Sequence, residues 1–148
     1  MRTKLISLLC LLCALFWLAT LALTYTGRGI TAKNFSAQIH VSQTTFHHDE
    51  NIIVTFTIRN QSGRTFRYSR ASCFMFVHIP DTNYMPIGTL AYLTGFLRMF
   101  RRNETRTIER TMGSRLPKGE HQLLAFATIN AGGTRITMHA TPITLTVI

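Results

Sequence analysis

Two hydrophobic patterns divide this chain into unequal parts. Residues 5–23 form an apolar run without a charged side chain. Beyond it, apolar and polar residues alternate with a period of two, which is typical of β-strands that bury one face. The alternation is clearest where Ile52, Val54, Phe56 and Ile58 fall on the same face. We therefore expect an N-terminal hydrophobic helix followed by a domain built from strands.

Shorter alternating segments follow, and turn-forming residues separate them. The strands predicted from them cover residues 37–42, 52–59, 65–69, 73–79, 105–112, 121–129 and 134–147. Segment 73–79 is apolar on both faces, as a central strand would be, and the last strand is kinked at Pro142. About seven short strands without a convincing helix among them predict an all-β, immunoglobulin-like sandwich of two sheets.

The apolar run is predicted to be a membrane anchor. As a helix rising ~1.5 Å per residue it would span roughly 28 Å, close to the ~30 Å hydrocarbon core of a bilayer. The alternative is a signal peptide cleaved after Ala22, with Thr20 as the second small residue. We assign 1–26 to a signal-anchor or signal peptide, 27–34 to a linker and 35–148 to the strand domain. The domain would then be extracytoplasmic, either anchored to the membrane or secreted.

Charge indicates the kind of partner. Lys and Arg total 16 against 6 acidic residues, for a formal net charge of +10, and such a balance attracts anionic surfaces. Arginines are dense after residue 97, and aromatic residues of an apolar ridge over 84–100 lie beside them. The partner-binding residues predicted from this juxtaposition are Arg98, Arg101, Arg102, Arg106, Arg110, Phe96 and Phe100. Delivery across a membrane disfavours nucleic acid, so we expect a protein or an anionic envelope component.

No catalytic or metal-binding signature stands out. The chain lacks the motifs of serine hydrolases, zinc proteases, dinucleotide-binding folds and P-loops. His47 and His48 are adjacent and would point to opposite faces of a strand, and no third ligand is spaced to complete a site. Cys73 lies in the most apolar segment and is predicted to be a core residue. We expect no enzyme, no metal and no cofactor.

Three sequons for N-glycosylation fall in predicted turns or linkers. They begin at Asn34, Asn60 and Asn103. Their use would depend on a eukaryotic or viral secretory route, and chance alone would produce one or two of them in a Thr-rich chain.

Four stretches of the domain resemble a bacterial immunoglobulin-like family whose best-known member is the Bacillus intracellular proteinase inhibitor BsuPI. They are the strand Asp49–Gly63 ending in Asn60-Gln61-Ser62-Gly63, the core strand Cys73–Val77, the turn Arg102-Asn103-Glu104-Thr105 and the strand entry Leu116-Pro117-Lys118-Gly119-Glu120-His121. The resemblance covers about half of the chain and implies a sandwich fold with a binding role. No inhibitory loop residue can be matched.

These observations together predict a function. We expect a non-enzymatic, extracytoplasmic binding module, tethered to the membrane through residues 5–23, that contacts a protein or an anionic envelope component. The alternative is a secreted proteinase inhibitor similar to BsuPI.

Overall fold

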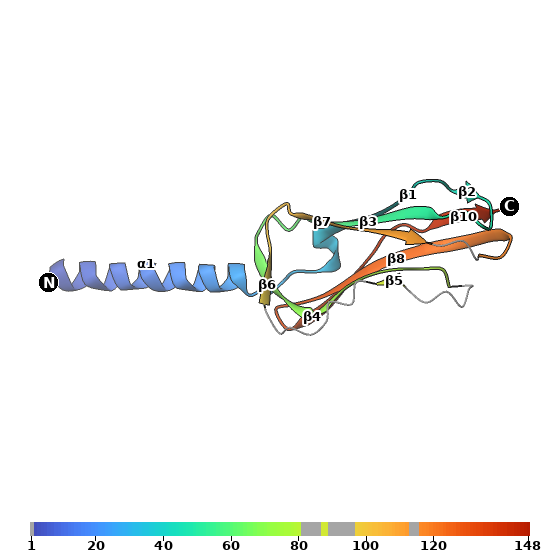
Figure 1. Cartoon of the computed structure of the whole chain (residues 1–148). Helices are drawn as coiled ribbons and strands as arrows, with labels where there is room; N and C mark the ends of the chain where they lie inside the picture. The colour runs from blue at the N-terminus through green and yellow to red at the C-terminus, as the bar shows by residue number, and fades with distance from the viewer. Residues whose placement is uncertain (1, 81–86, 89–96, 113–115) are drawn as a thin grey trace.

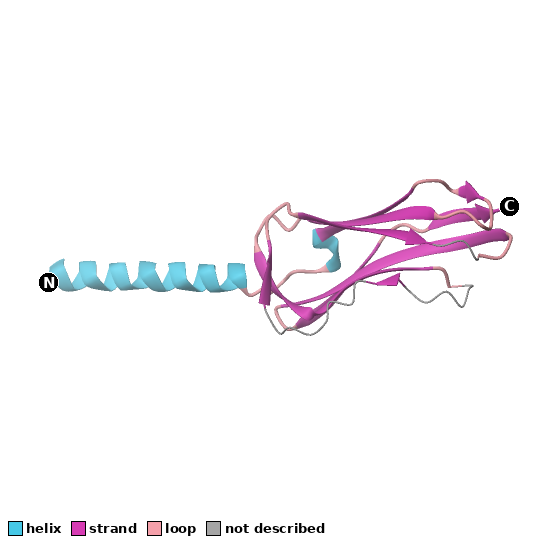
Figure 2. Cartoon of the chain, in the orientation of Figure 1, coloured by secondary structure: helices cyan, strands magenta, loops and turns pink. Residues whose placement is uncertain are grey.

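The computed structural model describes residues 2–80, 87–88, 97–112 and 116–148 (Figure 1). A helix, α1 (Arg2–Tyr25), projects from one end of a domain built mostly of strands, and the C-terminus lies at the other end of that domain (Figure 2). A short 3-10 turn, η1 (Ala32–Asn34), precedes the first strand. The strands are β1 (Phe35–Val41), β2 (Thr45–Phe46), β3 (Ile52–Asn60), β4 (Phe66–His78), β5 (Ile87–Gly88), β6 (Leu97–Phe100), β7 (Thr105–Met112), β8 (Gly119–Ala131), β9 (Thr134–His139) and β10 (Ile143–Val147).

The strands form two sheets. One has three antiparallel strands in the order β1-β3-β7. The other has seven strands in the order β2-β10-β8-β4-β5, with β6 pairing to β4 and β9 pairing to β8. All pairings in the second sheet are antiparallel except that of β10 with β2. The expectation of an all-β domain built from sheets after an N-terminal helix is thus confirmed, although the described residues form ten strands where about seven were predicted.

The predicted kink at Pro142 divides the last predicted strand in two. β9 pairs with the second half of β8, from Phe126 to Ala131, and β10 pairs with its first half. Between them, the backbone N–H of Ala140 donates a 3.0 Å hydrogen bond to the carbonyl of Ala125, so the interruption is short. Proline has no N–H to donate to a ladder, which explains why the strand breaks at this point.

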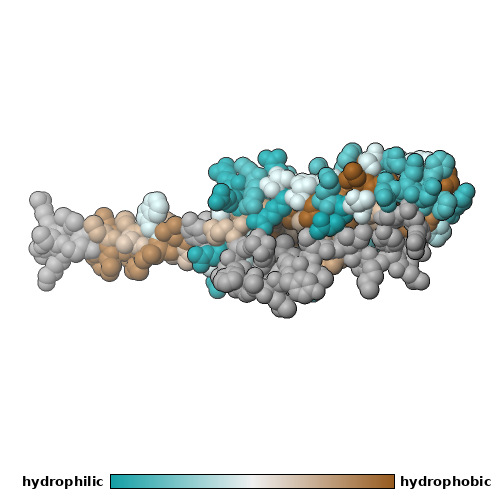
Figure 3. All heavy atoms as spheres, in the orientation of Figure 1, coloured by the Kyte–Doolittle hydropathy of each residue, from teal (hydrophilic) through white to brown (hydrophobic). Residues whose placement is uncertain are grey.

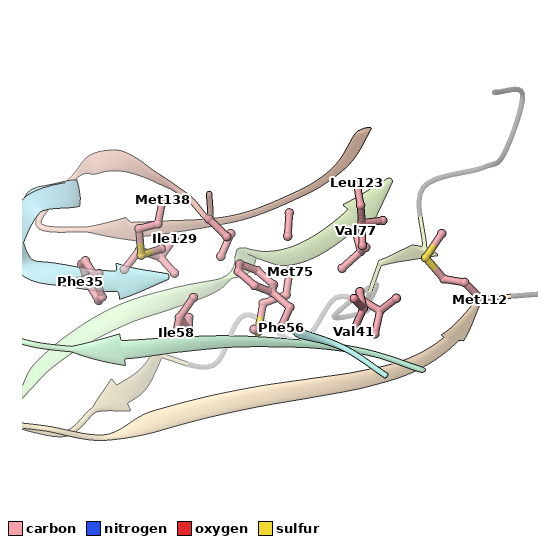
Figure 4. Packing of buried hydrophobic residues seen from close by; sticks show 14 of the residues in the cluster. Phe35, Val41, Phe56, Ile58, Met75, Val77, Met112, Leu123, Ile129 and Met138 are labelled. Carbon is pink, nitrogen blue, oxygen red and sulfur yellow. The ribbon is translucent and has the colours of Figure 1, made fainter. Parts of the chain in front are cut away.

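The inner faces of the two sheets share one hydrophobic core. Ile52, Val54, Phe56 and Ile58 are each at most 1% exposed, which confirms the alternation predicted for this strand. Figure 4 shows Phe56 and Ile58 among the buried side chains. They belong to the same buried cluster as alternate residues of β8, among them Leu123. Full burial of a side chain of this size contributes about 1.5–3 kcal/mol, so this face is a large part of the stability of the domain.

Strand β4 joins two segments that the sequence pattern separates. The predicted strands 65–69 and 73–79 are parts of the single strand β4. Its register against β8 shifts between Ser69 and Phe74, which marks a bulge or irregularity. From Ser69 to Phe74 β4 advances five residues while β8 advances two, and an odd number of extra residues reverses the inside–outside alternation, so the pattern looked like a break.

Residues before β1 are attached to the domain. Ile30, in the segment predicted to be a linker, is only 4% exposed and belongs to the core. A Cβ atom placed on Gly27 would lie 2.9 Å from Cβ of Ala131 and 3.1 Å from the backbone N of Gly132. The chain leaving α1 therefore packs directly against the turn between β8 and β9.

Helix α1 differs from the predicted membrane anchor. Within the part of the chain that the structure describes, no helix is both long and apolar enough to cross a bilayer. This finding contradicts the predictions of a transmembrane helix and a signal anchor over residues 5–23.

Candidate binding surface

A buried asparagine organises the end of the domain from which α1 projects. Asn60, the last residue of β3, is fully buried. Its Nδ2 donates to the backbone carbonyls of Arg64 at 2.9 Å and Arg101 at 2.8 Å. Its Oδ1 accepts hydrogen bonds from the backbone N–H of Ser62 at 2.9 Å and from the Ser62 hydroxyl at 2.6 Å. One side chain thus holds together two turns that are distant in the sequence.

Further hydrogen bonds bring arginines from several segments to this end. The guanidinium of Arg64 donates to the backbone carbonyl of Arg28, in the segment that follows α1. The backbone N–H of Arg102 donates to the Thr65 hydroxyl at 3.0 Å. Arg67 lies at the start of β4, where its carbonyl is 3.2 Å from the position that a Cβ on Gly27 would occupy. Residues separated by more than seventy positions therefore meet around the base of the helix.

We call these residues the arginine collar. Its members are Arg28, Arg64, Arg67, Arg101 and Arg102. All are exposed except Arg64, which is half-buried. Figure 3 shows hydrophilic side chains over the part of the domain next to the helix. Among the described residues, the acidic side chain that contacts this region is Glu104, which binds the backbone N–H of Arg101 at 2.6 Å and the side chain of Arg106 at 2.8 Å. The collar therefore presents a concentrated positive charge.

Arg106 is used inside the domain. Its guanidinium lies 4.8 Å from the ring centroid of Phe100 and 5.1 Å from that of Tyr68. It also donates to the Tyr68 hydroxyl, to Oε1 of Glu104 at 2.9 Å and to the carbonyl of Met99 at 2.9 Å. A half-buried arginine with these contacts stabilises the packing of β7 against β6 and β4, and few of its donors remain for a partner.

The other predicted binding residues fall in different places. Phe100 is 1% exposed and packs against Phe35, Phe66 and Tyr68, so it is a core residue without surface for a partner. Arg110 lies five residues along β7 from Thr105, the residue at which the strand leaves the collar. Arg110 is therefore roughly 17 Å further from the collar than Thr105 is.

The remaining two predicted residues are Arg98, which lies in β6, and Phe96. Arg98 is paired with Tyr68 in the register of β6 and β4. Phe96 and most of the predicted apolar ridge over 84–100 lie outside the described residues. Of the predicted set, the structure therefore brings Arg101 and Arg102 together.

Sequence reasoning missed the contribution of Arg28, which stands in the predicted linker. The signal that could have found it is weak. It is the polar residue Asn60 at the end of an otherwise apolar strand face, which indicates that distant turns come together here. The proximity of Arg64 and Arg67 to Arg101 depends on the pairing of β4 with β6.

The histidine pair and the sequons have ordinary surroundings. His47 and His48 are exposed, and Oε2 of Glu50 accepts the backbone N–H of His47 at 2.8 Å, which closes a turn. Among the described residues, no group of three or more His, Cys, Asp or Glu side chains is arranged to hold a metal ion. Asn60 is buried and its side-chain amide is engaged, whereas Asn103 is exposed in a left-handed turn with φ of 58°.

Comparison with known proteins supports the fold. Northeast Structural Genomics Consortium target SoR45 superposes with a TM-score of 0.51 at 10% identity, over 80% of this chain and 90% of that chain. The CARDB domain of PF1109 from Pyrococcus furiosus gives 0.46 at 13% identity, over 78% and 94% of the two chains. A β-glucosidase from Erythrobacter marinus gives 0.46 at 12% identity, over 77% of this chain.

The likeness ends at the fold. This chain spans about 15% of the length of that β-glucosidase. The similarity to SoR45 has a TM-score above 0.5, and at 10% identity it concerns architecture and not activity. No protein-family model and no curated protein sequence matches the chain. The resemblance to the BsuPI family therefore stays a prediction.

Proposed function

We propose that this protein is a non-enzymatic binding module that contacts an anionic partner through the arginine collar. The observation that supports the proposal most directly is the convergence of Arg28, Arg64, Arg67, Arg101 and Arg102 at one end of a strongly basic chain. Exposed arginines near one another raise the local concentration of an anion and bind it through charge-assisted hydrogen bonds.

The collar arginines are held in defined positions, which favours a specific binding site over a merely basic surface. Asn60 fixes the backbones of Arg64 and Arg101, and Arg64 in turn binds the backbone of Arg28. Arginines held on fixed backbones lose less entropy on binding than arginines on a mobile tail. The partner we propose is an anionic polymer or an acidic protein surface.

We further propose that the scaffold is an immunoglobulin-like sandwich. Its two sheets pack around one core, and its strands are almost all antiparallel. Such sandwiches commonly serve as rigid supports whose loops at one end make the contacts. The collar lies at such an end, because it is built from the turns after β3 and β6, the start of β4 and the segment before η1.

A charge-reversal experiment tests the proposal. The full chain is bound to immobilised inorganic polyphosphate over a range of salt concentrations. The double variant Arg101→Glu, Arg102→Glu is compared with Arg110→Glu, Lys118→Glu, which changes the net charge equally but lies outside the collar. We expect the collar variant to bind roughly tenfold or more weakly and to depend less on salt, and the control to stay near the wild-type affinity. Equal losses in the two variants would show that net charge alone governs binding.

The location of the module is also a proposal. The apolar start of the chain can act as a signal peptide cleaved after Ala22, which would place the domain outside the cytoplasm. N-terminal sequencing of the protein from its own cells would then give Leu23 as the first residue. A mature chain that still begins at Met1 would contradict this location.

A further inference from the structure

A groove runs beside the free edge of the smaller sheet. It has a volume of about 440 Å³ and is lined by β1, by the outer face of β3 and by the connection between β9 and β10. Ala37, Gln38, Ile39 and His40 form the side contributed by β1, and Thr141 and Pro142 belong to the opposite side. This volume is within the range of sites that bind ligands, about 300–1,000 Å³.

The edge of β1 carries unused backbone groups. β1 is the terminal strand of its sheet and pairs only with β3 among the described strands. The hydrogen bonds at its two ends fix the phase of the ladder: Gln61 N–H donates to Asn34 at 2.7 Å, and Ser42 N–H donates to Ile53 at 2.9 Å. In an antiparallel ladder alternate residues point their N–H and C=O groups to opposite sides.

Counting from those two ends identifies the free groups. Gln38 and His40 fall on hydrogen-bonded positions opposite Thr57 and Thr55, so their backbone groups face β3. Ala37 and Ile39 therefore direct their N–H and C=O groups outward, toward the groove that both residues line. An exposed row of such donors and acceptors is a template for another strand.

The opposite wall limits what can enter. Pro142 lies between β9 and β10, the two strands that pair with β8 in succession. It has no N–H to offer to an incoming strand. Apart from Ile39, the walls contributed by β1 and β3 are lined by small or polar side chains, including Thr55 and Thr57. This combination suits an extended backbone with short side chains better than a helix or a compact apolar ligand.

Charge decides between two possible extended occupants. A second copy of this chain would bring together two molecules that each carry a formal charge of +10. The described residues that line the groove include no carboxylate and no Lys or Arg. The net charge of the whole chain therefore favours a segment from a different protein, neutral or acidic in composition, over a second copy.

We infer that the groove along β1 binds an extended, neutral or acidic peptide segment of a protein partner, which adds to the sheet as a fourth strand beside Ala37 and Ile39. This site is separate from the arginine collar, since it lies along the edge of the sheet and needs backbone pairing instead of positive charge. It holds whether or not the collar binds an anion.

The test uses peptides selected from a random twelve-residue library for binding to the full chain. Their backbone amides are then methylated one at a time, which removes a donor without changing the side chain. We expect losses of tenfold or more at alternate positions and tolerance at the positions between them. Amide hydrogen exchange of the complex should slow at Ala37 and Ile39.

A variant of the protein completes the test. Ala37→Pro removes an N–H that faces the groove and not one that bonds β3, so the domain should fold while peptide affinity falls tenfold or more. Gln61→Ala is the control, because Gln61 is exposed, is not among the residues that line the groove, and keeps its backbone donor when its side chain is trimmed. Should Ala37→Pro fail to fold, the methylation pattern of the peptides decides alone.

Several results would overturn the inference. Methylation losses without a period of two, slowed exchange at other amides, or unchanged binding by a folded Ala37→Pro variant would each do so. The same holds if no peptide is selected, if the selected peptides are predominantly basic, or if the chain dimerises through this edge in sedimentation experiments.

Discussion

The side-chain amide of Asn60 donates a 2.8 Å hydrogen bond to the backbone carbonyl of Arg101, 41 positions further along the chain. Asn60 is the last residue of β3, and Arg101 is the first residue after β6. This contact makes the geometry of the arginine collar a property of the folded core, because the residue that positions the turn is itself fully buried.

Replacing Asn60 with alanine should destabilise the protein strongly. The carbonyls of Arg64 and Arg101 would lose their donor, and Ser62 would lose its acceptor. We expect the free energy of unfolding to fall by about 2–3 kcal/mol in urea titrations. Gln61→Ala, an exposed neighbour in the same turn, should stay within about 0.5 kcal/mol of the wild type. Equal stability of the two variants would contradict the bracing role of Asn60.

Arg106 should matter for stability more than for binding. Its guanidinium stacks on Phe100 and Tyr68 and pairs with Glu104, so Arg106→Ala removes packing together with charge. We expect a loss of about 1–2 kcal/mol that changes little with salt, since stacking is screened less than an exposed ion pair. Arg106→Lys should recover only part of it, because lysine lacks the planar fork.

Arg110→Ala provides the comparison for Arg106. Its described hydrogen bond is to the carbonyl of the preceding residue, Glu109, and it should cost less than about 0.5 kcal/mol. A similar loss for the two arginines, or a loss at Arg106 that vanishes in high salt, would show that the stacking contributes little.

The sequence pattern was a good guide wherever burial follows a simple period. The alternation from Ile52 to Ile58 correctly gave a strand with one buried face, and Pro142 correctly marked an interruption. The pattern failed at β4, because a bulge changes the phase of the alternation without ending the strand. It also gave no sign of the short strand β2, whose two residues are too few to show a period.

The candidate site was harder to predict than the fold. Proximity along the chain grouped Phe100, Arg106 and Arg110 with Arg101, yet the first is in the core and the second stacks on it. Which side chains meet is decided by the register between β4 and β6 and by the hydrogen bonds of Asn60. A single sequence does not contain that register, so the arginine at position 28 could not be connected to the others.

The two glycines of the β8–β9 turn should respond differently to alanine. Both have positive φ, 58° at Gly132 and 81° at Gly133, so either substitution carries backbone strain of about 1–2 kcal/mol. At Gly132 the new Cβ would also lie 2.8 Å from the backbone N of Arg28, whereas nothing lies within 4 Å at Gly133. We expect Gly132→Ala to cost at least about 1 kcal/mol more than Gly133→Ala in thermal or urea unfolding. Matching losses would mean that the segment after α1 does not pack on this turn.

Truncation should locate the true start of the folded domain. The described core begins at Ile30, so a chain of residues 23–148 retains every buried side chain of the cluster. We expect its free energy of unfolding to equal that of the full chain within about 0.5 kcal/mol. A chain of residues 31–148 loses Ile30 and the packing of Gly27 against Ala131, and it should be less stable by about 2–4 kcal/mol. Urea titration of both chains, with circular dichroism to confirm that the strands persist, makes the comparison. If 31–148 were as stable as 23–148, residues 27–34 would behave as the linker that their polar composition predicts, and the arginine at position 28 would have no fixed place in the collar.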